Sequence, residues 1–204
     1  MAVPFGALAR RPGTGLLLVQ PLVVAAAVAV SAAVAGYPAQ LLAAALLVAW
    51  VAVVAGLGRP VRRAVQPGPL RARPLRAGPA GLVLVAAPAA LVYAWQQVHD
   101  WQAAGSADIT LGLDHRPMQG ALGLALLGVA VLAALGAGTR ASGWRVPVWT
   151  VAVAASWLGL VSAAYPDLEG SLGRTLGVTV AVWGLVFAAL VEASVRGRRT
   201  AVAR

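Results

Sequence analysis

The fold is decided by stretches such as residues 117–137, PMQGALGLALLGVAVLAALGA, which contain no charged side chain and no histidine. An α-helix rises about 1.5 Å per residue, so about 20 apolar residues cross the roughly 30 Å hydrocarbon core of a bilayer. Five further apolar stretches have a similar length: residues 15–35, 39–57, 79–98, 146–165 and 172–191. The sequence therefore predicts an all-α integral membrane bundle of six transmembrane helices, arranged as three hairpins in a single domain of residues 1–204.

The overall composition excludes an ordinary soluble domain. Of the 204 residues, 60% are hydrophobic and 11% are charged, whereas a soluble domain has about 25% charged residues. Cysteine is absent, which excludes disulfides, thiolate nucleophiles and cysteine-based metal sites. Every basic residue is Arg and Ala is abundant, and this composition resembles that of proteins encoded by high-GC bacterial genomes.

The distribution of charge predicts the orientation of the chain. Fourteen of the sixteen Arg residues fall on one side of a six-span arrangement, and five of the six acidic residues fall on the other. The Arg-rich segments are residues 1–14, 58–78, 138–145 and 192–204. Basic residues in short loops stay on the inner side of a membrane, so we expect a plasma-membrane protein with both termini cytoplasmic. Residues 1–35 also fit a secretory signal peptide, although the apolar run is longer than usual for one.

The net charge of +10 at first suggests a nucleic-acid partner, but this chain has too little polar surface for one, and we expect none. Residues 58–78 form a Pro/Arg-rich cytoplasmic linker. We expect this linker to set the topology and to lie near anionic lipid headgroups of the bilayer. A membrane-protein partner or a homo-oligomer is also compatible with the sequence, and no cofactor is predicted.

The most polar outward segment is the predicted tip of the second hairpin, residues 95–119, which contains both histidines of the chain. His99, Asp100, Asp114 and His115 lie at the ends of two helices that one loop joins. Imidazole and carboxylate groups bind divalent metals, so these four residues are a candidate joint metal site. The alternative is a structural interfacial loop, since no recognised metal-binding spacing is present. No catalytic residue is predicted.

Polar and bulky residues within the spans leave two interpretations open. Gln20 either lines a polar path or bonds a neighbouring helix, and Pro21 and Pro88 predict kinks. Three tryptophans near the middle of their spans either line a lipid- or quinone-sized cavity or fill space: Trp50, Trp157 and Trp183.

Two helix contacts are predicted at the ends of the last span. Gly173 and Gly177 form a pair of small residues suited to close helix packing. Glu192 precedes Arg196 by four residues, which predicts an ion pair within one helix.

The leading functional hypothesis is a small accessory or structural membrane component. It rests on the absence of a charge in the middle of any span and of a nucleotide-binding motif. The first alternative is a transporter or channel-like protein for a neutral or lipophilic solute. The second is a membrane enzyme or metal-binding protein that uses the outward His/Asp residues.

Overall fold

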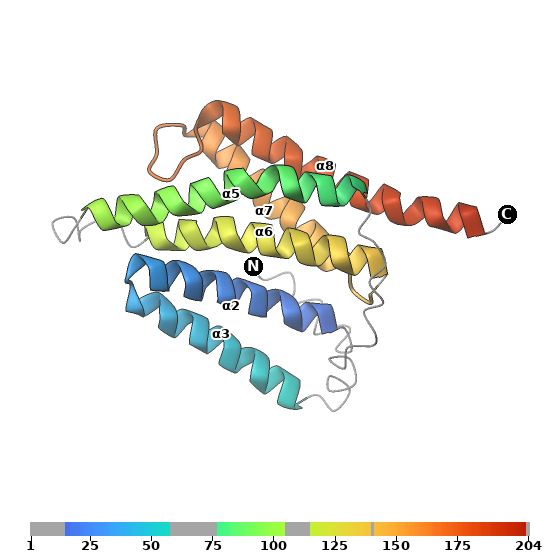
Figure 1. Ribbon diagram of the computed structural model, residues 1–204, viewed down its shortest axis with the longest axis horizontal. Coiled ribbons are helices and arrows are strands. Elements are labelled where there is room, and N and C mark those ends of the chain that lie inside the picture. The colour runs from blue at the N-terminus through green and yellow to red at the C-terminus, as the bar shows by residue number, and fades with distance from the viewer. Residues whose placement is uncertain (1–14, 58–76, 105–114, 140, 203–204) are drawn as a thin grey trace.

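The computed structural model describes residues 15–57, 77–104, 115–139 and 141–202, and within them the chain forms six α-helices (Figure 1). The helices are α2 (Gly15–Ala35), α3 (Pro38–Leu57), α5 (Ala77–Ala104), α6 (His115–Thr139), α7 (Arg145–Ala164) and α8 (Gly173–Val202). All six are long and apolar enough to cross a membrane. The prediction of an all-α chain with six such helices is therefore confirmed.

Helices α5 and α8 extend well beyond the apolar stretches that predicted them. Helix α5 continues through polar residues to Ala104, and the end of α8 projects past the other helices (Figure 1). An apolar stretch marks only the part of a helix that suits hydrocarbon, so it does not set where the helix ends. Pro21 and Pro88 lie inside α2 and α5, where each removes one backbone hydrogen bond without ending the helix.

Helix α6 lies in the middle of the arrangement and packs against α2, α5 and α7 (Figure 1). Helix α3 lies at one edge, where it packs on α2. The most extensive contact joins α7 to α8. Helix α5 also touches α8, where the indole nitrogen Nε1 of Trp183 donates to the carbonyl oxygen of Leu82 at 3.2 Å.

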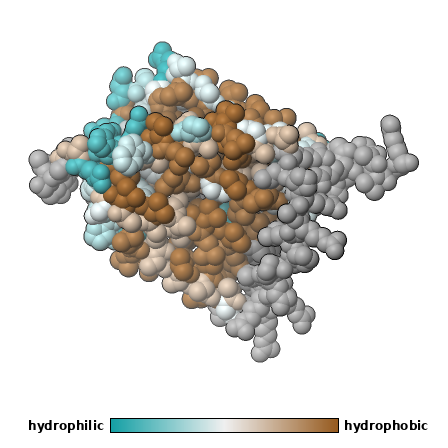
Figure 2. Space-filling view, viewed as in Figure 1, coloured by the Kyte–Doolittle hydropathy of each residue, from teal (hydrophilic) through white to brown (hydrophobic). Residues whose placement is uncertain are grey.

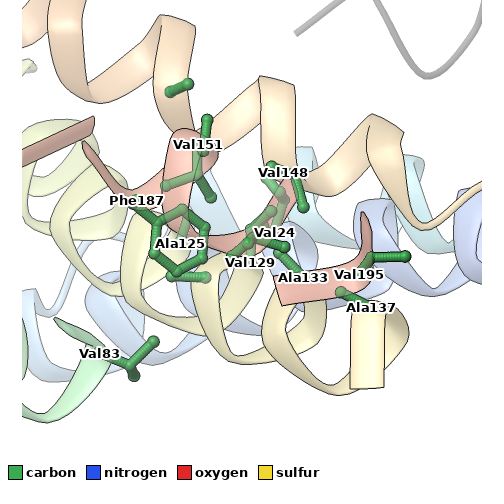
Figure 3. Packing of buried hydrophobic residues seen from close by; sticks show 14 of the residues in the cluster. Val24, Val83, Ala125, Val129, Ala133, Ala137, Val148, Val151, Phe187 and Val195 are labelled. Atoms are coloured by element: carbon green, nitrogen blue, oxygen red, sulfur yellow. The ribbon is translucent and has the colours of Figure 1, made fainter. Parts of the chain in front are cut away.

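The core consists mainly of Ala and Val side chains from five of the helices. Phe187 of α8 is completely buried in it and lies beside Val151 of α7 and Ala125 of α6 (Figure 3). Trp183 stacks on Phe187 with the ring centroids 5.4 Å apart. Because lipid tails are as apolar as these side chains, close packing and interhelical hydrogen bonds stabilise such a bundle.

Helices α7 and α8 approach most closely at two glycines. A Cβ atom added at Gly177 would lie 2.7 Å from the carbonyl oxygen of Gly159, which leaves no room for a side chain. Gly173, the other member of the predicted pair, has nothing within 4 Å of such an atom, and its backbone φ is +74°. The prediction is therefore right for Gly177 and wrong for Gly173, which instead allows the turn into α8.

The predicted partner of Glu192 is also wrong. Its carboxylate pairs with Arg145 at the start of α7, with a Nε–Oε1 distance of 2.7 Å and a Nη2–Oε2 distance of 3.1 Å. This ion pair joins two helices, whereas the predicted pair with Arg196 would have joined two turns of one helix. Side chains far apart in sequence meet here because α7 and α8 pack along their length.

The surface separates into a broad hydrophobic zone and a hydrophilic end (Figure 2). In that view the hydrophilic residues gather at the end of the bundle where α5 ends and α6 begins. The hydrophobic zone runs over the middle of the helices. Exposed apolar side chains of α5 include Leu84, Val85 and Leu91. The predicted basic linker lies outside the described residues from 58 to 76.

A candidate ligand groove between helices α6 and α7

A groove of about 570 Å³ runs along the contact between α6 and α7. Its floor is formed by apolar side chains of α6, including Leu122, Leu126 and Val129. One wall is a face of α7 that carries Ala154, Leu158 and Val161 at helical spacing. A volume of this size and this mostly apolar lining are typical of small-molecule sites.

The groove opens on the side of the bundle. Val153 and Trp157 of α7 belong to its lining, yet 61% and 70% of their surfaces are exposed. A side chain that both lines a groove and faces outward marks the mouth of that groove. A ligand can therefore enter laterally, between the helices, without passing through either end of the bundle.

The groove closes at one end because α2 and α7 converge there. Val146 of α7 packs against Leu17 and Leu18 of α2, which are almost completely buried. Gln20 and Val24 of α2 line the groove just beyond this contact. The lining continues from there to the turn between α7 and α8, residues 165–171.

The opposite end is polar and is covered by that turn. The hydroxyl of Tyr93 donates to the carbonyl oxygen of Gly170 at 3.0 Å, and Gln119 Nε2 donates to that of Glu169 at 3.5 Å. Arg116 lies 3.6 Å from the Glu169 carboxylate and 2.9 Å from that of Asp100. These contacts from α5 and α6 fix the turn at the polar end of the groove.

Gln20 is the only described polar side chain that is both almost fully buried and unpaired at the closed end of the groove. Its surface is 2% exposed, and Oε1 has no hydrogen-bond partner among the described residues. Thr150, across the groove, donates its hydroxyl to the carbonyl oxygen of Val146 in its own helix. Neither interpretation of Gln20 matches the structure: the residue borders a cavity, but that cavity is mostly apolar, and within the described residues Gln20 makes no hydrogen bond to a neighbouring helix.

Two members of the predicted metal site have other partners in the structure. Asp100 pairs with Arg116, and the ring of His99 stacks on Trp95 with centroids 6.2 Å apart. Asp114 and the side chain of His115 lie outside the described residues. Within the described residues no cluster of three potential ligands is present. A joint site of the four residues stays a prediction.

The tryptophans near the middle of their spans were predicted either to line a cavity or to fill space, and the structure shows one example of each role. Trp157 lines the groove, whereas Trp183 packs on Phe187 in the core. Trp50 of α3 is not part of the groove lining. Tyr93, Thr150 and Ser162 also line the groove, and no local feature of the sequence indicates this. The helical spacing of Thr150, Ala154, Trp157 and Val161 marks one face of α7, but that face could equally have been packed on another helix.

No family model, curated protein or solved structure matches this chain. The residues of the groove are therefore the basis on which a function is assigned.

Proposed function

We propose that this chain is a small integral membrane protein that binds a neutral lipophilic ligand in the groove between α6 and α7. The observation that carries the proposal is the lateral, mostly apolar groove that extends from the turn at residues 165–171 to Gln20. Of the neutral and lipophilic solutes that the sequence allows, a lipophilic molecule fits best, because the mostly apolar lining suits an apolar molecule and not a hydrated one.

The distribution of charge in the lining supports a neutral ligand. Among the described lining residues, Glu169 is the one with a charge, and it lies in the turn at the polar end. An ionised group on a ligand would have no counter-ion along the floor or at the closed end, and an unpaired charge is costly in a medium of low polarity.

The open side of the groove supports entry from the bilayer. Trp157 and Val153 lie at the mouth of the groove on a helix whose outward residues are apolar and suit contact with lipid tails. A lipophilic molecule dissolved in the hydrocarbon core reaches this mouth by lateral diffusion. An accessory protein that presents or stores such a molecule needs no further catalytic group.

The test is to identify lipophilic molecules that remain bound to the purified full chain. Ala154 lines the groove, so Ala154→Phe fills it, whereas Ala189→Phe adds the same ring to the exposed side of α8. We expect mass spectrometry to detect a bound neutral lipid with the natural chain and with Ala189→Phe, but several-fold less with Ala154→Phe. Equal retention by the two variants would exclude the groove as the binding site.

We also propose that the protein lies in a bacterial plasma membrane with both termini in the cytoplasm, as three outward-pointing hairpins. The uneven distribution of Arg between the two sets of loops supports this orientation. The chain has no cysteine, so single introduced cysteines report topology directly. An impermeant thiol reagent added to intact cells should label Ala107→Cys and not Ala64→Cys, and the reverse pattern would invert the orientation.

A further inference from the structure

The two ends of the groove differ in the polar groups that a ligand can reach. At the closed end, the Oε1 atom of Gln20 is fully buried, and Thr150 donates its hydroxyl within α7. At the polar end, Tyr165 and Glu169 line the groove and are exposed, with 65% of the Glu169 side chain accessible. Among the described lining residues, a polar group of a ligand therefore finds its accessible partners at the polar end.

The polar end also lies beyond the apolar part of the bundle. The turn of residues 165–171 falls between the apolar segments of α7 and α8 that are suited to cross a membrane. The α7 lining runs from Thr150 to Ser162, which is about 18 Å of helix at 1.5 Å per residue. Lipids in a bilayer have their head groups at the interface and their chains in the hydrocarbon core. A lipid that enters through the lateral mouth can therefore bring its head group to the polar end without turning over.

Two hydroxyls at the polar end already use their hydrogens within the protein. Tyr93 donates to the carbonyl oxygen of Gly170 at 3.0 Å, and the hydroxyl of Ser171 donates to that of Ser162 at 3.2 Å. The ionised carboxylate of Glu169 can only accept hydrogen bonds. This end of the groove therefore offers a ligand mainly acceptors, which favours a head group that supplies donors.

The carboxylates around the polar end outnumber the guanidinium groups. Arg116 lies 2.9 Å from Asp100 but 3.6 Å from Glu169, so Glu169 is the less closely paired of the two acids. Asp167 in the same turn and Arg174 at the start of α8 are both exposed. Three carboxylates and two guanidiniums leave an excess of negative charge, which disfavours an anionic head group.

We infer that the ligand is a neutral single-chain lipid whose hydroxyl-bearing head group, such as a glycerol, donates a hydrogen bond to the Glu169 carboxylate. This inference rests on the proposed function and specifies both the class of the ligand and its direction in the groove. The chain lies along Leu122, Leu126 and Val129 toward the closed end. One chain is specified because about 570 Å³ is the size of a site for one small molecule.

The experiment compares three probes that share the myristoyl chain: 1-myristoylglycerol, methyl myristate and, at alkaline pH, ionised myristate. The full chain is placed in phosphatidylcholine nanodiscs, and native mass spectrometry measures the bound probe. We expect Glu169→Gln to weaken the binding of 1-myristoylglycerol about threefold, because a neutral acceptor replaces a charged one. The same variant should leave methyl myristate unchanged and should strengthen the binding of myristate several-fold. Each probe partitions equally into identical bilayers, so differences between variants report on the protein.

The matched control is Asp167→Asn. Asp167 belongs to the same turn and is exposed, but it is not part of the groove lining. This variant removes the same charge and should leave the binding of 1-myristoylglycerol unchanged. If thermal unfolding shows that Glu169→Gln is destabilised, Glu169→Asp keeps the charge and should bind myristate as weakly as the natural chain does.

Three results would overturn the inference while leaving the groove as a lipid site that Ala154→Phe blocks. The first is unchanged binding of 1-myristoylglycerol by Glu169→Gln, and the second is an equal loss in Asp167→Asn. The third is an equal loss of all three probes in Glu169→Gln, which would mean that the substitution disturbs the groove and does not act through the head group. Absence of binding by every probe, or binding that Ala154→Phe leaves unchanged, would contradict the proposed function itself.

Discussion

The two sides of helix α7 differ in how closely their neighbours approach. Toward α8, Gly159 lies against Gly177, and the hydroxyl of Ser156 donates to the carbonyl oxygen of Ala181 at 3.1 Å. Toward α6, Leu158 and Val161 face a groove of about 570 Å³. One helix therefore takes part both in a backbone-to-backbone contact and in the border of a cavity.

The difference shows how residue size controls helix separation in an apolar bundle. Glycine has no side chain, so two helix backbones can come into van der Waals contact at glycine residues. Branched and aromatic side chains keep helix backbones farther apart. A gap in the bundle is stable only if something apolar fills it or lipid reaches it.

The closest contact should be the most sensitive to added volume. A Cβ atom at Gly159 would collide with the backbone of Gly177 and Ala181, so Gly159→Ala has to push α8 away. We expect the free energy of unfolding to fall by about 3 kcal/mol, at the upper end of overpacking effects. Unfolding by a denaturing detergent measures this change.

Gly81→Ala is the matched control, because a Cβ atom there has nothing within 4 Å. It should leave stability unchanged or raise it slightly, since Ala favours a helix over Gly. Equal losses for Gly159→Ala and Gly81→Ala would mean that helix propensity, not contact between α7 and α8, determines the result.

The stability of the turn over the polar end of the groove should depend on the hydroxyl of Tyr93. Tyr93→Phe keeps the ring but removes the hydrogen bond to Gly170, which should lower the free energy of unfolding by about 1 kcal/mol. Tyr37→Phe is the control, because its ring contacts Trp101 while its hydroxyl has no hydrogen bond within the described residues. Thermal unfolding of the two variants should differ, and identical midpoints would contradict a role for the hydroxyl.

The ion pair at the start of α7 should contribute less to stability than the hydroxyl of Tyr93 does. Glu192→Gln removes the charge that Arg145 contacts, and we expect a small decrease in the unfolding midpoint. The effect is small because Arg145 is largely exposed, so water and salt screen its charge. The double variant Arg145→Gln, Glu192→Gln should be no less stable than Glu192→Gln alone, and a further decrease would show that Arg145 acts through other contacts.

Filling the groove should have the smallest effect on stability. Ala154 is five residues before Gly159 on the same helix, but it faces empty space. Ala154→Phe should therefore change the free energy of unfolding by less than about 0.5 kcal/mol in the absence of ligand. Detergent unfolding beside Gly159→Ala gives the comparison directly. A loss as large as that of Gly159→Ala would mean that the groove cannot accept a ring.

The candidate site was predicted only in fragments. Gln20 and Trp157 stood out in the sequence because each interrupts a run of small apolar residues. Nothing local distinguished a cavity wall from a packed interface, since the two surfaces have similar compositions. The sequence near Tyr93 does not indicate its contact, because its partner, Gly170, lies 77 residues away in the sequence. Glu192 was assigned to Arg196 by helical spacing, whereas its partner Arg145 lies 47 residues away.

The six apolar helices follow from the amino-acid sequence alone, because the fit of a segment to hydrocarbon depends on its own length and charge. It also showed that the spans lack ionisable groups near their middle, which limits the chemistry that the bundle can perform. Which face of α7 meets α8 and which borders the groove depends instead on how the helices pack in three dimensions. It placed Gln20 at the closed end of that groove, because contact and separation between helices depend on pairs of residues from different spans.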